Sequence, residues 1–144
     1  MDKSKEVSAG LKLVNDRVKF IGTVDNNQPI SIDYIPPLGD NTGYTSLELL
    51  LLSLSSCVGT SVLTFLRRMH KTINGFEVKS SGIRKEEHPT GFSTIFLEII
   101  LASPDVSDDD MNKVIKMSEE TYCPVWSMLK GNTNVEVRFS IIKN

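Results

Sequence analysis

Short apolar stretches alternate with turn residues over the first third of the chain. Between Val7 and Asp33, three stretches with period-two patterning (VSAGLKLV, RVKFIGTV and PISIDYI) are separated by Asn-Asp and by Asp-Asn-Asn-Gln. Alternation with this punctuation is typical of antiparallel strands joined by tight turns. We therefore expect a three-stranded meander, followed at residues 36–44 by a loop rich in Pro, Gly, Asn and Asp.

A long apolar segment follows this loop. Thr45 or Ser46 offers an N-cap, and the apolar stretch from Leu47 to about Met69 predicts a helix of roughly 24 residues, about 36 Å long. Its uncharged window, residues 49–66, is just long enough for a membrane span but carries too many Ser and Thr hydroxyls for a lipid-facing helix. We expect this helix at the centre of a fold or of a dimer, and no membrane partner.

Strand patterns return after this helix. Residues 76–85 and 93–102 alternate and predict a hairpin around a Pro-Thr-Gly turn. Residues 133–142 predict a last strand.

Two further helices are predicted between these strands. Ser107, with Asp110 three residues later, indicates a capping box for a helix that runs to about Tyr122, and Pro124 favours a short helix over 125–130. The element order βββ-α-ββ-αα-β predicts an α+β fold, and the length of 144 residues predicts a single domain.

Composition and charge narrow the function classes. Hydrophobic residues make up 40% and charged residues 24% of the chain, which is ordinary for a globular protein. The net charge of −2 gives the protein no overall positive potential that would attract the phosphate backbone of a nucleic acid, so nucleic acid is not an expected partner. Two cysteines and a polar, charged start without a secretory leader favour a cytoplasmic protein with reduced thiols.

The two cysteines are the candidate chemistry. Cys57 lies inside the long helix among small residues, which suits either tight core packing or a substrate beside the sulfur. Cys123 stands at a helix break before Pro124, where free amides and a helix dipole would lower the pKa of a thiol; it could equally fill the joint between two helices. A thiolate oxidised to a sulfenic acid can be trapped by a second thiol, provided the two Cα atoms lie within about 7 Å.

The sequence resembles the OsmC/Ohr family (osmotically inducible protein C-like and organic hydroperoxide resistance proteins). The similarity runs from about Val7 and is most specific in TSLELLLLSLSSCVG and SEETYCPVWSMLKGNTNVEV, with EEHPTGF as a further match. The resemblance implies a thiol-dependent peroxidase of organic hydroperoxides, built as an intertwined homodimer with its long helices at the centre. It also implies that Cys57 is the peroxidatic cysteine, that Cys123 is the resolving one, and that an external dithiol is the reductant.

The resemblance further implies an arginine that assists the departing alcohol and a glutamate that orients it. Arg17 is the best match for the arginine, although a lone hairpin arginine is often merely solvent-exposed. The glutamate's position, ten residues before the cysteine, is occupied by Leu47, with Glu48 one place later and Ser46 where other subgroups have proline. On a straight helix, Glu48 would lie half a turn around the axis from Cys57 and roughly 13 Å along it. It could therefore act only through Arg17, through a kink or across a dimer. The alternative is that its negative charge simply interacts favourably with the N-terminal end of the helix dipole.

We expect no cofactor and no metal. The spacing of His70 and His88 matches no zinc pattern, and there is no nucleotide-binding fingerprint. The aromatic residues predicted to form core or pocket walls are Phe65, Phe92, Phe96 and Trp126. Two alternatives remain at this stage: a non-enzymatic dimeric stress or ligand-binding protein with packed cysteines, and thiol-disulfide exchange with proteins, which the lack of a C-x-x-C pair disfavours.

Overall fold

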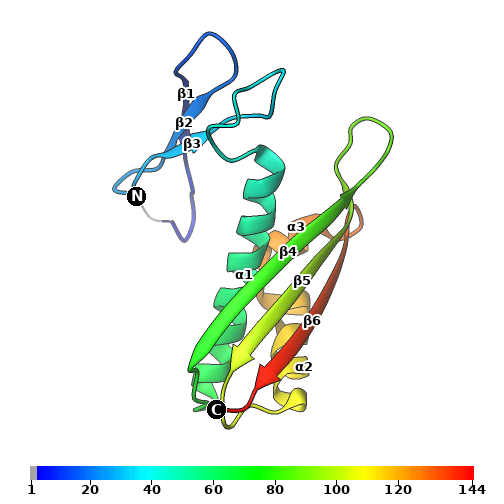
Figure 1. Ribbon diagram of the computed structural model, residues 1–144. Coiled ribbons are helices and arrows are strands. Elements are labelled where there is room, and N and C mark those ends of the chain that lie inside the picture. Colours follow the sequence, from blue (N-terminus) through cyan, green and yellow to red (C-terminus); the bar gives the residue numbers. More distant parts are fainter. Residues whose placement is uncertain (1–2) are drawn as a thin grey trace. The chain divides into compact units, whose positions relative to one another are not determined.

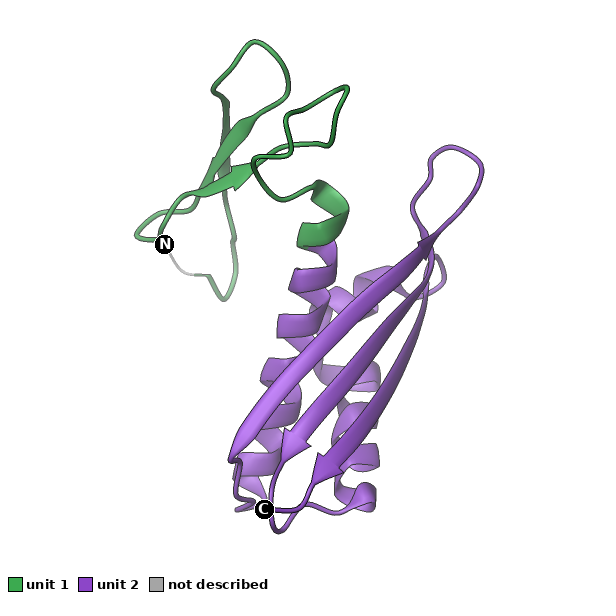
Figure 2. Ribbon diagram, in the orientation of Figure 1, with its two compact units in different colours: residues 1–49 green, residues 50–144 purple. Residues whose placement is uncertain are grey.

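The chain forms two compact units, residues 1–49 and residues 50–144 (Figure 2), in a computed structural model that describes residues 3–144. Each unit contains one three-stranded sheet. The α+β class predicted from the sequence is confirmed. That the whole chain is one domain stays a prediction.

The sheet of the first unit is the predicted antiparallel meander. β1 (Gly10–Leu13), β2 (Phe20–Thr23) and β3 (Ile30–Ile32) pair in the order β1-β2-β3 (Figure 1). Asn26, in the turn between β2 and β3, has a φ of 62°, a left-handed conformation that Asn tolerates better than most residues. The turn residues that punctuate the sequence therefore do set the strand boundaries.

The long helix α1 (Ser46–Arg68) has the predicted extent. Its start is a capping box: the Thr45 N–H donates to the Glu48 carboxylate (2.8 Å), and the Glu48 N–H donates to Thr45 Oγ1 (3.2 Å). Past its end, His70 adopts a left-handed φ of 59°, a conformation common after a helix terminus. Local side-chain chemistry thus fixes where α1 begins and where it stops.

By length and composition α1 could cross a membrane, with a mean hydropathy of 2.0 over its most apolar window. This is weak evidence, because the core helix of a soluble protein passes the same test. Leu54, Val58, Val62 and Leu66 recur every fourth residue and are fully buried, so one face of α1 is a core face.

The sheet of the second unit carries that core. β4 (Gly75–Arg84) and β5 (Phe92–Ala102) form the predicted hairpin, and β6 (Asn134–Ile142) pairs parallel to β5. Figure 1 shows α1 and the second helix, α2 (Asp108–Met117), on the same side of this sheet. Alternate residues of β5 face the helices and are buried, namely Ile95, Leu97, Ile99 and Leu101.

The connection from β5 to β6 differs from its prediction in one respect. A capping box between Ser107 and Asp110 starts α2 (Asp108–Met117) as expected, but the predicted helix does not continue as an α-helix to Tyr122. Residues Ser118–Tyr122 form a single π-helical turn, labelled η1, closed by the Cys123 N–H to the Ser118 carbonyl (2.9 Å). The predicted short helix, α3 (Pro124–Leu129), follows.

The cause of this wide turn is a buried side chain at its start. Ser118 is fully buried, and its hydroxyl contacts the Val114 carbonyl (2.9 Å) and Ser61 Oγ of α1 (2.7 Å). A serine that bonds back to the fourth preceding carbonyl distorts a helix at that point. The extra residue in the turn sets the position of Cys123.

Candidate functional site

A groove of about 400 Å³ runs along α1 in the second unit, and we call it the Cys57 groove. Most of its wall is one face of α1, and the rest comes from the end of η1 and the start of α3. Its lining residues are Ser56, Cys57, Thr60, Ser61, Thr64, Phe65, Arg68, Tyr122 and Pro124. The groove combines hydroxyl groups, two aromatic rings, one thiol and one guanidinium.

Cys57 lies half-buried in the middle of α1 and borders this groove. Its sequence neighbours are small, as noted above, and this leaves the sulfur open to the groove on one side. The sequence context suited either core packing or a substrate beside the sulfur, and the structure gives the side chain access to a cavity. A small molecule in the groove can therefore touch the Cys57 sulfur.

Cys123 is the N-cap of α3 and is only 2% exposed. Its Sγ accepts a hydrogen bond from the Trp126 N–H at 3.4 Å, as an N-cap side chain does. The side chain of Cys123 also interacts with that of Cys57. The structure thus brings together two thiols that lie far apart in the sequence.

The predicted effect of this position on the Cys123 thiol is wrong. Burial raises the pKa of Cys123 to about 11, and its hydrogen bond with the Cys57 side chain acts in the same direction. The backbone N–H groups of Trp126 and Val125 lower that pKa, as expected from a helix start, but they do not outweigh the loss of solvent. Cys123 is therefore a protonated thiol at neutral pH.

An aromatic pair forms part of the groove wall. The rings of Phe65 and Tyr122 lie 4.6 Å apart between centroids and are tilted by 50°, and the guanidinium carbon of Arg68 stands 5.4 Å from the Phe65 centroid. Phe65 was predicted as core or pocket wall. Tyr122 and Arg68 were not predicted as site residues. Two signals in the sequence could have identified them: Tyr122 directly precedes Cys123, and Arg68 follows Cys57 by eleven residues, which places both on the same face of a helix.

The other predicted aromatic residues lie outside this groove. Trp126 and Phe92 are buried core residues, 4% and 7% exposed. Phe96 lines a separate cavity at the second sheet, next to Lys79 and Arg138.

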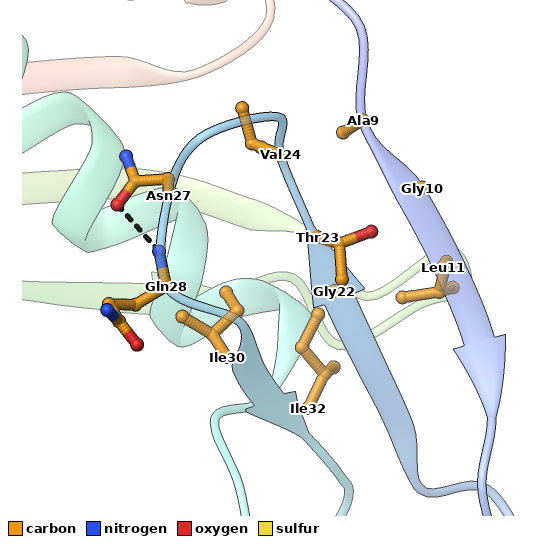
Figure 3. A pocket seen from close by; sticks show the side chains of 10 residues that line it. All are labelled: Ala9, Gly10, Leu11, Gly22, Thr23, Val24, Asn27, Gln28, Ile30 and Ile32. Atoms are coloured by element: carbon orange, nitrogen blue, oxygen red, sulfur yellow. Dashed lines mark hydrogen bonds between the residues drawn. The ribbon is translucent and has the colours of Figure 1, made fainter.

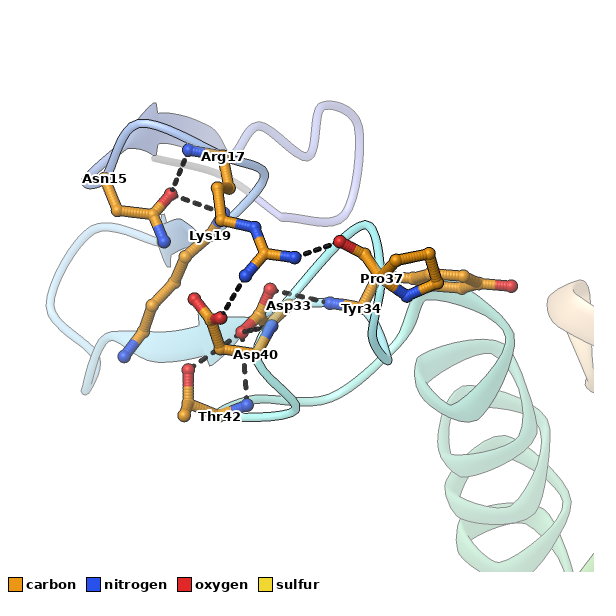
Figure 4. Close-up of polar contacts among 8 residues, drawn as sticks. All are labelled: Asn15, Arg17, Lys19, Asp33, Tyr34, Pro37, Asp40 and Thr42. Carbon is orange, nitrogen blue, oxygen red and sulfur yellow. Dashed lines mark hydrogen bonds and ion pairs between the residues drawn. The ribbon is translucent and has the colours of Figure 1, made fainter.

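Arg17 and Glu48 lie in the first unit, where the structure does not pair them. The Arg17 guanidinium forms an ion pair with Asp40 and donates to the Pro37 carbonyl (Figure 4). The Glu48 carboxylate is engaged in the capping box with Thr45, and these hydrogen bonds hold its pKa below the ordinary value. Within residues 3–144, Asp40 is the carboxylate that pairs with Arg17, and a role of Glu48 through a kink or across a dimer stays a prediction.

Asp33 organises the loop that carries Asp40. Its carboxylate is 3% exposed and accepts hydrogen bonds from the N–H groups of Tyr34, Asp40 and Thr42 and from the Thr42 hydroxyl (Figure 4). Burial alone would raise the pKa of Asp33, but these four donors lower it to about 2. The sequence marked this segment as a loop and missed the carboxylate that holds it in one conformation.

The first unit leaves its apolar side chains uncovered. Of residues 3–49 only Asp33 and Gly39 are buried. A cavity of about 430 Å³ lies against the sheet, and Figure 3 shows Leu11 of β1 together with Ile30 and Ile32 of β3 around it. Covering these apolar side chains with another protein surface would stabilise the sheet.

Known proteins share this fold over nearly the full chain. The profile of a family described as OsmC-like protein matches residues 39–138. Protein YhfA of Escherichia coli K12 is 27% identical over 96 residues, which cover 67% of this chain and 72% of that protein.

Solved structures are similar to this chain over a larger share of its length. An OsmC-like protein from Mycoplasma pneumoniae superposes with a TM-score of 0.82 at 21% identity and covers 99% of both chains. The organic hydroperoxide resistance protein OhrB of Bacillus subtilis superposes with a TM-score of 0.63 at 16% identity, covering 94% of this chain and 98% of that one. At these identities the superpositions establish the fold.

Proposed function

The chain belongs to the OsmC-like protein family, and on this premise we propose that it reduces organic hydroperoxides with the thiols of Cys57 and Cys123. The observation that carries the proposal is the meeting of these two side chains beside the Cys57 groove. A peroxide-related redox role also agrees with the name of the Bacillus relative, an organic hydroperoxide resistance protein. The proposal places the protein in the cytoplasm, where thiols are kept reduced.

Cys57 is the attacking sulfur in this proposal. It borders the groove, whereas Cys123 is buried and keeps its proton because its pKa is about 11. As a thiolate, the Cys57 sulfur attacks the terminal oxygen of the hydroperoxide. The O–O bond breaks, the terminal oxygen stays on sulfur as a sulfenic acid, and the remainder leaves as an alkoxide that takes a proton to become an alcohol. Sulfur loses two electrons and the hydroperoxide gains them.

Cys123 then closes a disulfide. Its sulfur attacks the Cys57 sulfenic sulfur, the S–S bond forms, and the sulfenic hydroxyl leaves with the Cys123 proton as water. An external dithiol reduces this disulfide, so that its own thiols become a disulfide and both cysteines regain their protons. The cycle uses no bound cofactor.

Family resemblance alone assigns Arg17 to the departing alkoxide in this proposal. A guanidinium there would stabilise the negative charge that develops on the alcohol oxygen. Asp40, its partner within the first unit, is the group that would hold its orientation. Glu48 keeps its capping role at α1.

The working form in this proposal is a homodimer in which a second copy covers the sheet of the first unit. Leu11 is 60% and Ile30 41% exposed in the single chain, and both border the cavity of Figure 3. Clustered apolar exposure of this kind marks an interface. Light scattering should give the mass of a dimer, and the Leu11→Glu variant should shift it toward the monomer. A monomeric wild-type protein would refute this part of the proposal.

Counting free thiols by mass spectrometry tests the chemistry. The reduced protein is treated with one equivalent of cumene hydroperoxide or of hydrogen peroxide. We expect both thiols to disappear into a Cys57–Cys123 disulfide, faster with the organic peroxide, and Cys57→Ser to lose turnover. Two thiols that persist after long exposure would instead favour a non-enzymatic ligand-binding dimer, the alternative that Leu47 and Ser46 support as departures from the family pattern.

A further inference from the structure

The Cys57 groove has a chemical polarity along its length. Arg68 lies eleven residues after Cys57, which on an α-helix is three turns, about 16 Å along the axis, and within about 20° of the same face. Thr60, Ser61 and Thr64 occupy the wall between them. A thiol therefore stands near one end of the groove and a cation near the other.

Arg68 is the one charged residue among those that line the groove. Its guanidinium lies over the Phe65 ring, and Phe65 in turn packs against Tyr122. Within residues 3–144 no carboxylate forms an ion pair with Arg68. The ring contact holds the cation at the groove wall with its hydrogen-bond donors unused by acidic side chains.

We propose that Arg68 selects organic hydroperoxides that carry a carboxylate, with that group at the guanidinium and the peroxide at Cys57. This inference rests on the proposed function. An apolar chain between the two groups would contact Phe65 and Tyr122, and the planar guanidinium binds a carboxylate through two parallel hydrogen bonds. The chemical class is thus an amphipathic hydroperoxy carboxylic acid whose carboxylate lies away from the reacting oxygen.

A basic residue near a helix C-terminus also stabilises the helix, because its positive charge interacts favourably with the negative end of the helix dipole. Arg67 serves as a control that separates this effect from substrate selection. Arg67 and Arg68 both lie in the last turn of α1 and both are exposed, but only Arg68 lines the groove. A role in helix stability would be shared by the two residues. A role in substrate selection belongs to Arg68 alone.

The test compares a hydroperoxy fatty acid with its methyl ester, which differ only in the charge. For the wild type and Arg67→Gln we expect kcat/KM to favour the acid, mainly through KM. Arg68→Gln should lower kcat/KM for the acid about tenfold and leave the ester within twofold, and Arg68→Lys should recover part of the loss. An unchanged preference for the acid in Arg68→Gln would overturn the inference while turnover of the ester upholds the proposed function.

A binding measurement keeps the inference testable if the wild type turns over neither substrate, in which case the proposed function fails. Calorimetry then compares dodecanoate with dodecanol on the same variants. Tighter binding of dodecanoate that Arg68→Gln abolishes and Arg67→Gln retains supports carboxylate recognition at Arg68. Equal binding of the two ligands, or a preference that survives in Arg68→Gln, refutes it.

Discussion

The buried hydroxyl pair of Ser61 and Ser118 joins the two segments that carry the cysteines. Ser61 lies one turn after Cys57 on α1, and Ser118 opens the π-helical turn before Cys123. The oxygens are 2.7 Å apart, Ser118 is fully buried and Ser61 is 8% exposed. Removing the Ser118 hydroxyl therefore leaves the mostly buried Ser61 hydroxyl, at the wall of the Cys57 groove, without this partner.

The expected magnitudes follow from what each variant leaves behind. Ser118→Ala removes the contacts with Ser61 and with the Val114 carbonyl and strands the Ser61 hydroxyl, which should lower the free energy of unfolding by about 2 kcal/mol. Ser61→Ala leaves Ser118 bonded to Val114 and should cost about 1 kcal/mol. The double variant strands no hydroxyl and should cost about 2 kcal/mol, a coupling of about 1 kcal/mol.

Urea unfolding followed by the fluorescence of Trp126 measures these differences, at one fixed protein concentration because association would shift the midpoint. Ser56→Ala is the matched control, since its exposed hydroxyl contacts only the Ser53 carbonyl; it should stay within about 0.5 kcal/mol of the wild type. If the double variant equals the sum of the single ones within about 0.5 kcal/mol, the pair is uncoupled and the argument fails.

Three further predictions concern single residues. Because the folded-state pKa of Asp33 is about 2, below that of an unfolded aspartate, its contribution to stability should be complete above about pH 4 and fall as the pH drops toward 2; Asp33→Asn should flatten that part of a Tm-against-pH curve. Gly82→Ala should lower Tm, since a Cβ would lie 2.4 Å from Phe92 ring carbons, with a cost of about 1–3 kcal/mol in urea unfolding. Cys57→Ser keeps the burial that raises the pKa of Cys123 and removes the contribution of the Cys57 thiol, so iodoacetamide should label Cys123 at pH 8 far more slowly in the folded protein than after denaturation, and equal rates would contradict the raised pKa.

The element order was predictable because each element has a local signal. Turn residues separate the strands of the first unit, and the capping boxes at Thr45 and Ser107 mark the starts of α1 and α2. The π-helical turn has no such signal. It depends on the contact of Ser118 with Ser61, which are far apart in the sequence and meet only when α2 packs beside α1.

The two cysteines of the candidate site were predictable from the sequence, but their electrostatics and several of their neighbours were not. The motifs identified both cysteines, yet the pKa of Cys123 was predicted in the wrong direction. The dipole of a six-residue helix is a local effect that sequence can suggest, whereas burial of the thiol depends on the assembled core. Asp40 as the partner of Arg17 was missed for the same reason, because a loop closed by Asp33 places it there.

The unequal exposure of the two thiols bears on thiol-disulfide exchange with proteins, the remaining alternative from the sequence. An exchanger must present a sulfur to a macromolecular disulfide, but Cys123 is 2% exposed and Cys57 lies inside a groove of about 400 Å³. A hydroperoxide or a small dithiol can enter such a groove, while a folded protein surface cannot follow it to the sulfur. Under the proposed function, the same geometry predicts a small oxidant and, as reductant, a small dithiol or a thiol on a narrow, extended segment.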